Sequence, residues 1–191
     1  HIVSTDSRQF FKEMSIGTAK PSTEELNQVS HHLVDFLSIH SSYSAKEFEH
    51  DALNTLRRLG EDFRNVVITG GSGLYLKALL GEIDDIPETT AEIRQKVNEL
   101  FNEKGVSGLR ELLFKVAPQY YASIDTNNPR RLQRGLEIYY SSGKPPNEVF
   151  KESKKKQPLR PFRHIHFCLY RDRKELHERI DSRVDQMVDQ G

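Results

Sequence analysis

A short polar run, Asp6, Ser7, Arg8 and Gln9, follows an apolar, β-branched segment at residues 2–4. In parallel α/β sheets, ligands gather at the carboxyl ends of strands, and Asp6 would lie at such an end. A carboxylate there can accept a proton from an amine or hydroxyl group, or can hold a metal ion. The alternative interpretation is that Asp6 or Ser7 only caps a turn. The spacing alone leaves both interpretations open.

A glycine-rich turn at residues 70–73, which contains Ser72, follows a second β-branched run at residues 66–69. The order strand, glycine-rich turn, helix brings backbone N–H groups and a helix N-terminus towards an anion or a sugar. The turn is not the phosphate-binding P-loop motif, because no Gly-Lys-Ser or Gly-Lys-Thr follows it. Tight packing of the strand against the helix explains the glycines equally well.

Three arginines, Arg130, Arg131 and Arg134, lie in the first turns of a predicted helix at residues 129–140. Asn128 is its expected N-cap, followed by a proline at the first helical position. A helix N-terminus already carries partial positive charge, so cations there cost roughly a few tenths of a kcal/mol each. This pattern favours an anionic partner such as phosphate, with a solvated basic face as the alternative. Leu132 supplies part of the core-facing side.

Arg179 and Arg183 are four residues apart on the last predicted helix and therefore share one face. They flank an apolar stripe, which places them at the edge of the core, where a cleft would lie. Surface salt bridges with neighbouring acids are the common alternative. The adjacent His31 and His32 point in different directions, so we interpret them as a structural pair near a strand start rather than as metal ligands.

The elements that position these residues predict an α/β fold with a mostly parallel sheet. We expect strands at residues 2–4, 33–36, 66–69 and 165–169. The patterns Ser22-x-x-Glu25 and Ser44-x-x-Glu47 are capping boxes, each of which opens a helix. The second of these helices should run from about residue 45 to residue 59 and stop at Gly60.

Between residues 90 and 142 the chain shows helical patterns only, which predict helices at residues 91–103, 109–116 and 129–140. An acidic, proline-ended stretch (82–87) and a basic stretch (151–163) bound this block. The basic stretch could bind a polyanion or could be a solvated linker. We therefore predict an α/β core at residues 1–86, a helical insertion at 87–158, and a return to the core at 159–191.

The composition limits the class of protein further. The 191 residues carry zero formal net charge, with 36% hydrophobic residues, and no run approaches the length of a membrane span. The single cysteine, Cys168, rules out an internal disulfide; we expect it to be a small buried hydrophobe in a protein of the reducing cytosol. The chain opens inside a predicted strand and closes on a helix that leads nowhere, so we expect further segments at both ends.

Taken in order, these motifs resemble those of the tRNA dimethylallyltransferase, or isopentenyltransferase, family. The resemblance covers essentially the whole chain. It rests on residues 6–9, 16–21, 31–35, 43–45, 70–75, 128–134 and 176–184.

The resemblance implies a P-loop NTPase-like parallel sheet core with an inserted all-helical domain. It implies transfer of a dimethylallyl group from dimethylallyl diphosphate to N6 of the adenosine 3′ of the tRNA anticodon. Asp6 would then be the general base that takes the N6 proton, and Arg183 would hold the departing diphosphate, with Arg179 beside it. The implied partners are the anticodon stem-loop and dimethylallyl diphosphate, with Mg²⁺ as cofactor, in a cytoplasmic monomer that has no membrane partner.

The resemblance also implies which residues contact the RNA. Ser72 stands where the family usually has threonine, and it keeps the hydroxyl group. The implied contacts come from the polar corner, the glycine turn and the helical block: Asp6, Ser7, Arg8, Gln9, Ser72, Arg94, Arg130, Arg131, Leu132, Gln133 and Arg134.

One departure from the family affects activity. The family's phosphate loop would precede His1 and its C-terminal helices would follow Gly191, so we expect this chain by itself to be inactive. Two alternative functions stay open at this point. One is prenylation of free adenine nucleotides, which does not need a long helical insertion. The other is a non-catalytic RNA-binding fragment, which turnover would separate from an enzyme.

Overall fold

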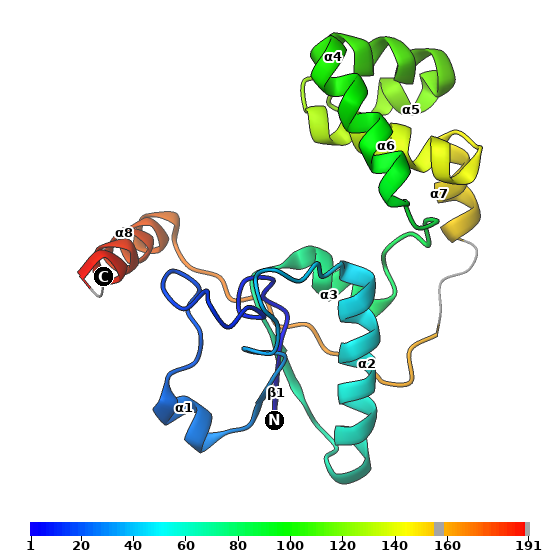
Figure 1. The fold of residues 1–191 in the computed structure, drawn as a ribbon. Coiled ribbons are helices and arrows are strands. Elements are labelled where there is room, and N and C mark those ends of the chain that lie inside the picture. The colour runs from blue at the N-terminus through cyan, green and yellow to red at the C-terminus, as the bar shows by residue number, and fades with distance from the viewer. Residues whose placement is uncertain (155–158, 190–191) are drawn as a thin grey trace. The chain divides into compact units, whose positions relative to one another are not determined.

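The computed structural model describes residues 1–154 and 159–189. The chain forms two compact units, one made of His1–Ile83 with Leu159–Gly191 and the other of Asp84–Pro158. The first unit contains the sheet and the second is helical, coloured green to yellow in Figure 1. The first boundary therefore falls after Ile83, three residues before the one expected from the sequence.

A three-stranded parallel sheet lies at the centre of the α/β unit. Its strands are β1 (Ile2–Ser4), β2 (His31–His32) and β3 (Val67–Thr69), in the order β2-β1-β3. Ile2 is in register with both His31 and Val67. Because both pairings are parallel, the chain leaves all three strands at the same edge of the sheet. The predicted strand at residues 2–4 is confirmed, and the one at residues 66–69 begins one residue later.

Three helices accompany this sheet: α1 (Thr23–Gln28), α2 (Ala45–Asp62) and α3 (Gly73–Leu80). Both predicted capping boxes are present, with the hydroxyls of Ser22 and Ser44 accepting backbone N–H groups at the starts of α1 and α2. The prediction that α2 stops at Gly60 was wrong. The helix continues to Asp62, because a single helical glycine costs only about 1 kcal/mol and the ladder of hydrogen bonds is unbroken to Phe63.

An aromatic core lies under the polar corner. Phe10, which directly follows Gln9, is fully buried with Phe48 of α2, and their rings stack 5.5 Å apart. Tyr43 and Tyr75 meet the Phe10 ring edge-on at 5.3 Å each. Burial of Phe10 anchors the chain immediately after the corner, so the corner cannot shift without disturbing this core.

Two predicted strands are absent from the structure. Residues 33–36 form a bend rather than a strand, with Leu33 and Asp35 at φ values of 59° and 54°, and an isolated bridge joins Phe11 to Leu37. Residues 165–169 are also not a strand, because among the described residues none pairs with them. Cys168 is consequently exposed, so the expectation that it is buried was wrong. A strand needs a hydrogen-bonded neighbour as well as a β-prone sequence.

The last helix, α8 (Arg173–Asp189), directly follows Asp172, whose carboxylate accepts the N–H of Lys174 at 2.9 Å. It has no buried residue, and its predicted apolar stripe, represented by Ile180 (51% exposed) and Val184 (52%), faces solvent. The chain leads into this helix from Arg160, which pairs with Glu49 and donates to the carbonyl of Ala78. Arg160 is thus an anchor within the α/β unit rather than a free cation of the basic stretch.

The helical unit contains α4 (Ala91–Val116), α5 (Pro118–Ser123), α6 (Pro129–Ser142) and α7 (Pro146–Lys154). A kink at Gly105, with φ of 62°, divides α4 in two, as the predicted break there requires. The caps predicted for α6 are confirmed, since Asn128 accepts the N–H of Arg130 and Gly143 ends the helix in the left-handed region. Helices α5 and α7 were not predicted.

The core of this unit forms where α4 packs on α6. It consists of Val97, Leu109, Leu113, Ala117, Leu132 and Leu136, all at most 1% exposed. At Gly135 a side chain would come within 2.5 Å of the Tyr120 ring, so the glycine permits the close approach of α6. In the part of the chain that the structure describes, no helix is long and apolar enough to cross a membrane.

Candidate active site

The corner at Asp6 is built by the close approach of two loops at the carboxyl edge of the sheet. The Thr5 N–H donates to the Thr69 carbonyl at 2.8 Å, which extends the pairing of β1 and β3 by one residue. Gly70 follows with φ of 157°, and a Cβ atom there would lie 2.5 Å from Thr5 and 2.7 Å from the Asp6 nitrogen. Only glycine fits, so the glycine turn brings the Ser72 segment directly against Asp6.

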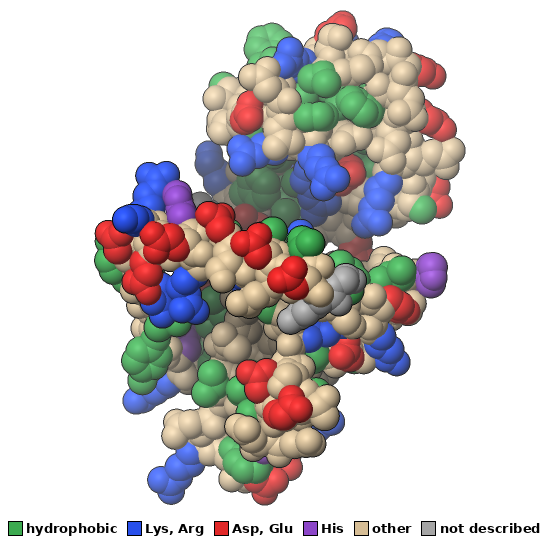
Figure 2. Space-filling model, turned by 90° about the vertical axis from the view of Figure 1, so that its left-hand side faces the viewer, with side chains coloured by type: hydrophobic (Ala, Val, Ile, Leu, Met, Phe, Trp, Pro, Cys, Tyr) green, Lys and Arg blue, Asp and Glu red, His purple; other side chains and the backbone are tan. Residues whose placement is uncertain are grey.

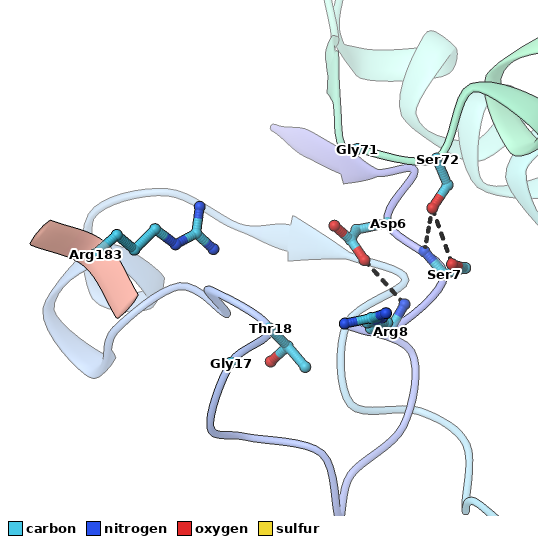
Figure 3. A pocket seen from close by; sticks show the side chains of 8 residues that line it. All are labelled: Asp6, Ser7, Arg8, Gly17, Thr18, Gly71, Ser72 and Arg183. Atoms are coloured by element: carbon cyan, nitrogen blue, oxygen red, sulfur yellow. Dashed lines mark hydrogen bonds between the residues drawn. The ribbon is translucent and has the colours of Figure 1, made fainter. Parts of the chain in front are cut away.

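Hydrogen bonds then fix the orientation of the corner. The Asp6 carboxylate accepts the Arg8 N–H at 2.9 Å, and the Asp6 N–H donates to the Ser4 hydroxyl at 3.2 Å. Ser72 does not cap its own helix α3; its hydroxyl accepts the Ser7 N–H and donates to the Ser7 hydroxyl, both at 2.9 Å. Ser72 therefore joins the glycine turn to the corner through its two hydrogen bonds to Ser7 (Figure 3).

A pocket of about 220 Å³ opens at this corner. This volume is below the roughly 300–1,000 Å³ of drug-sized sites, and suits a single planar base or a small alkyl group. In Figure 3 the Arg183 side chain of α8 extends towards Asp6 from the opposite side of the pocket. The residues that line the pocket are Asp6, Ser7, Arg8, Gly17, Thr18, Gly71, Ser72 and Arg183.

The charged side chains of the pocket suit an anionic ligand held by arginines next to a carboxylate that can accept a proton. Asp6 is the only carboxylate among the lining residues, and the two cations are Arg8 and Arg183. Among the described residues neither Asp6 nor Arg183 has an ion-pair partner, so both can engage a ligand. A carboxylate can accept a proton from a nucleophile, while a fixed guanidinium stabilises negative charge that develops on a leaving group.

Five of the predicted site residues, Asp6, Ser7, Arg8, Ser72 and Arg183, are thus brought together, although the first and last are far apart in sequence. Two others are not at the pocket. The Gln9 side chain donates to the carbonyls of Thr18 and Ala19 and accepts from Ser4. Arg179 lies on the exposed surface of α8 and is not among the lining residues.

Two lining residues, Gly17 and Thr18, had no predicted role, whereas Gly71 belongs to the glycine-rich turn that was predicted to approach a ligand. Gly17 and Thr18 belong to the motif at residues 16–21 that contributes to the family resemblance, so the motif was visible but its place at the pocket was not. A side chain at Gly71 would come within 3.3 Å of the Asp6 carboxylate, which explains the glycine there.

The tyrosines beneath the corner have hydroxyls that are hydrogen-bonded within the core. The Tyr43 hydroxyl donates to the Asp51 carboxylate at 2.8 Å, and the Tyr75 hydroxyl donates to the Tyr43 carbonyl at 3.2 Å. Burial, followed by the hydrogen bond to Asp51, raises the pKa of Tyr43, and burial likewise raises the pKa of Tyr75. Both phenols stay protonated and hold the core together.

The remaining predicted residues lie on the helical unit. Gln133 donates to the Asn98 side chain at 3.0 Å, and Arg134 donates to the Thr89 hydroxyl at 3.0 Å. These bonds place the second turn of α6 beside the first half of α4, where Arg94 lies. Figure 2 shows Lys and Arg side chains gathered along one edge of this unit.

The arginines at the start of α6 differ in their availability. Arg130 and Arg131 are exposed, and neither has a carboxylate partner among the described residues, whereas Arg134 also pairs with Glu137 at 3.1 Å. Leu132, which is also among the residues predicted to contact RNA, has a side chain that is fully buried in the core. Leu132 holds α6 in place, and its neighbours are left to face a ligand.

The residues present do not form a protein cage for a metal ion. Among the described residues there is no group of three or more side chains of the kinds that hold a cation. Asp6 with the hydroxyls of Ser7 and Ser72 would supply fewer oxygens than a cation site made of protein alone requires.

The parallel α/β unit, with a glycine turn and a pocket at its carboxyl edge and an inserted helical unit, has a P-loop NTPase-like fold. The model of the IPP transferase family matches residues 9–191. The chain therefore belongs to the IPP transferase family.

Curated relatives agree with this assignment. The chain is 42% identical, over its whole length, to the tRNA dimethylallyltransferase of Christiangramia forsetii. It is 43% identical to tRNA dimethylallyltransferase 1 of Bacteroides thetaiotaomicron. The chain spans 62% of the first relative and 61% of the second.

Solved structures show the same relation. A eukaryotic dimethylallyltransferase acting on tRNA matches the whole chain with a TM-score of 0.81 and 28% identity, over 47% of its own length. The tRNA isopentenylpyrophosphate transferase of Bacillus halodurans matches with a TM-score of 0.59 and 32% identity, over 58% of its length.

Proposed function

We propose that the full-length protein transfers a dimethylallyl group from dimethylallyl diphosphate to N6 of the adenosine 3′ of a tRNA anticodon. The observation that carries this proposal is the pocket in which Asp6, the only lining carboxylate, lies across from Arg183. The names of the relatives and the action of the eukaryotic relative on tRNA support the same reaction.

The proposed reaction forms one bond and breaks one bond. The N6 nitrogen of adenine attacks C1 of the dimethylallyl group, the C1–O bond breaks, and diphosphate leaves with the bond's electron pair. Asp6 accepts the proton that N6 loses, because an exocyclic amine is a weak nucleophile at neutral pH. Arg183 stabilises the charge of the departing diphosphate. Ser7 and Ser72, whose hydroxyls are bonded to each other, line the pocket that would receive the adenine.

Adenosine must leave its stack to reach a pocket of this size, and base-modifying enzymes extrude their target base in this way. The exposed Arg130 and Arg131 at the N-terminus of α6 are placed to bind RNA phosphates. We propose that these residues and Arg94 hold the anticodon stem-loop while the corner acts on the base.

Mg²⁺ is part of the proposal only through the substrate. A cation that accompanies a diphosphate is bound mainly by the diphosphate oxygens, with few ligands from the protein. No step above depends on it, in keeping with the lack of a ligand cluster among the described residues.

The test is a transfer assay with the full-length protein, labelled dimethylallyl diphosphate and an anticodon stem-loop that has adenosine 3′ of the anticodon. The matched control is the same stem-loop with guanosine at that position. We expect label on the adenosine RNA and none on the control. Absence of label from both RNAs would sink the proposal.

The same assay separates the two alternatives. Labelling of AMP, ADP or ATP without labelling of RNA identifies an enzyme that makes free prenylated nucleotides. RNA binding without turnover on either substrate identifies a non-catalytic RNA-binding protein. The exposed arginines of the helical unit favour RNA over a mononucleotide, which has no backbone for them to bind.

A further inference from the structure

A loop at residues 11–20 forms one wall of the pocket. It leaves the corner after the buried Phe10 and brings Gly17 and Thr18 to the pocket. The single proton of the Thr18 hydroxyl is directed at the carbonyls of Met14 at 2.9 Å and Ser15 at 3.0 Å, so it is not donated to a ligand. The loop therefore shapes the pocket through its backbone, and its position must be fixed by contacts elsewhere.

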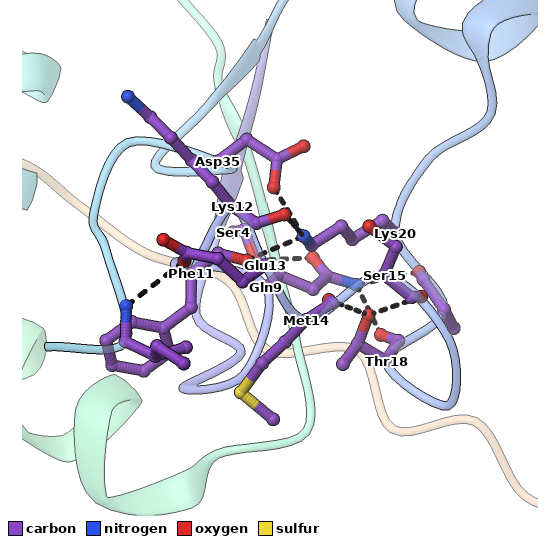
Figure 4. Close-up of polar contacts among 12 residues, drawn as sticks. Ser4, Gln9, Phe11, Lys12, Glu13, Met14, Ser15, Thr18, Lys20 and Asp35 are labelled. Carbon is purple, nitrogen blue, oxygen red and sulfur yellow. Dashed lines mark hydrogen bonds and ion pairs between the residues drawn. The ribbon is translucent and has the colours of Figure 1, made fainter.

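Lys20 closes this loop on its own beginning. Its ammonium group donates to the Phe11 carbonyl at 2.7 Å and to the Lys12 carbonyl at 3.3 Å, and it pairs with Asp35. A lysine has three N–H donors, so these three acceptors satisfy all of them. Only 9% of the Lys20 side chain is exposed, in contrast to an ordinary surface lysine. Figure 4 shows the ammonium group between the loop and Asp35.

Gln9 holds the other part of the loop. Its amide nitrogen donates to the carbonyls of Thr18 at 3.2 Å and Ala19 at 2.7 Å. Its amide oxygen accepts the hydroxyl of Ser4, the residue whose Oγ also accepts the Asp6 N–H. One chain of hydrogen bonds thus runs from Asp6 through Ser4 and Gln9 to the pocket wall.

The backbone is strained where these side chains bind it. Ala19, whose carbonyl Gln9 binds, has a φ of 48°. Asp35, the partner of Lys20, has a φ of 54° and donates its N–H to the Gln9 carbonyl at 2.9 Å. Residues other than glycine rarely adopt such angles, and they persist only where the surroundings impose them. Strain of this kind concentrates at sites whose geometry matters.

We propose that Lys20 is a positioning residue for the transfer reaction. With Asp35 and Gln9 it fixes the wall formed by Gly17 and Thr18 at a set distance from Asp6, so that the adenine amine is held in line with the base. This proposal rests on the proposed function. Lys20 does not touch the reacting atoms, and its effect is on the chemical step rather than on RNA binding, because the RNA-binding arginines lie on the helical unit.

The test compares Lys20→Met with Lys12→Met in the full-length protein. Methionine keeps the length and apolar stem of lysine but has no donor, and Lys12 is an exposed lysine of the same loop. We expect Lys20→Met to lower kcat for transfer by roughly 10- to 100-fold, with KM for the stem-loop changed by less than about threefold, since small misplacements carry such costs. Lys12→Met should match the wild type in both constants.

Hydrogen exchange gives a readout that does not need activity. We expect amides of residues 11–20 to exchange at least about tenfold faster in Lys20→Met, while those of α2 keep the wild-type rate. If Lys20→Met does not fold, Asp35→Asn is measured in its place. This substitution removes the only negative charge among the three acceptors of Lys20, and we expect smaller changes in kcat and in exchange rate in the same direction.

Three outcomes overturn the proposal: unchanged kcat with unchanged exchange, equal acceleration of exchange throughout the unit, or a change confined to KM for RNA. A wild-type protein that transfers no label refutes the proposed function instead. The role of Lys20 in fixing the loop is then decided by exchange alone, so the two failures remain distinct.

Discussion

The polar corner and the start of α6 present their functional side chains in opposite ways. At the corner, hydrogen bonds of 2.9 to 3.2 Å fix Asp6 within its own turn and join Ser7 to Ser72 of the glycine turn. At the start of α6, Arg130 and Arg131 are exposed and have no carboxylate partner among the described residues. Chemistry demands a fixed geometry, while attraction to phosphates acts over several ångströms and tolerates mobile side chains.

The two regions also differ in how the chain assembles them. The corner combines residues from the turn after β1, the glycine turn and α8, so it exists only when distant segments meet. The start of α6 is one continuous helix held by a cap and a buried leucine. Substitutions at the corner should therefore lower kcat and leave RNA binding unchanged. Substitutions at the start of α6 should weaken RNA binding and leave kcat unchanged.

The largest effect is expected at Asp6. Asp6→Asn keeps the shape and can still accept the Arg8 N–H, but an amide cannot take a proton from N6. We predict a fall in kcat of roughly 10²- to 10⁴-fold, the usual range for loss of a general base, with the Kd for the stem-loop unchanged. Single-turnover kinetics and RNA binding measured on one preparation check both halves. A kcat near that of the wild type rejects Asp6 as the base.

The next effect is on stability. Leu136→Ala leaves a cavity where α6 packs on α4 and should destabilise the helical unit by about 2–5 kcal/mol. Denaturant unfolding followed in that unit measures this loss. Lys115→Ala, at an exposed lysine of α4 in the same unit, is the control and should change stability by less than about 1 kcal/mol. Equal losses for the two variants would contradict the packing described for α4 and α6.

Loss of one phosphate contact comes third. Arg131→Gln should weaken stem-loop binding by about tenfold at moderate salt and lower the slope of log Kd against log salt concentration by about 1. The kcat should stay at the wild-type value, in contrast to Asp6→Asn. Arg64→Gln, an exposed arginine of the α/β unit, is the control and should leave binding unchanged. An unaltered salt slope in Arg131→Gln excludes a phosphate contact there.

The helical unit was the more predictable of the two from sequence. Its helix ends depend on local signals, such as Asn128 before a proline and Gly143 after the last turn, and the structure has both caps. The sequence also singled out Gly105 as a break. Local chemistry decides such positions, so no knowledge of distant contacts is needed.

The α/β unit was less predictable because strands depend on partners. The β-prone residues 33–36 became a bend with two left-handed residues, and residues 165–169 stayed unpaired. Asp6 and Ser72 were recognised as site residues, but the wall formed by Gly17 and Thr18 was not, since it is placed by the side chains of Gln9 and Lys20 across the loop. A pattern of residue types does not reveal such non-local hydrogen bonds.

The smallest effect is expected from the N-caps of α1 and α2, the helices of the α/β unit that open with capping boxes. Ser44→Ala removes the hydroxyl that accepts the Glu47 N–H at 3.2 Å and should lower the stability of the α/β unit by about 1 kcal/mol at pH 7. Ser22→Ala removes the same box from α1, which buries no residue, and should cost less. Equal losses of stability in the two variants would mean that the buried face of α2 does not make its cap more important than the cap of α1.

The Ser44 cap also predicts a dependence on pH. The Ser44 hydroxyl, and then its backbone N–H, lower the pKa of Glu47 below the ordinary value of 4.5. A lowered native pKa means that the ionised carboxylate stabilises the fold above that value, and that this part is lost as pH falls through the native pKa. The stability difference between wild type and Ser44→Ala should therefore shrink between about pH 5 and pH 3. Urea unfolding at several pH values measures this difference in stability. A difference that grows as the pH falls would show that the ionised Glu47 carboxylate does not support the cap.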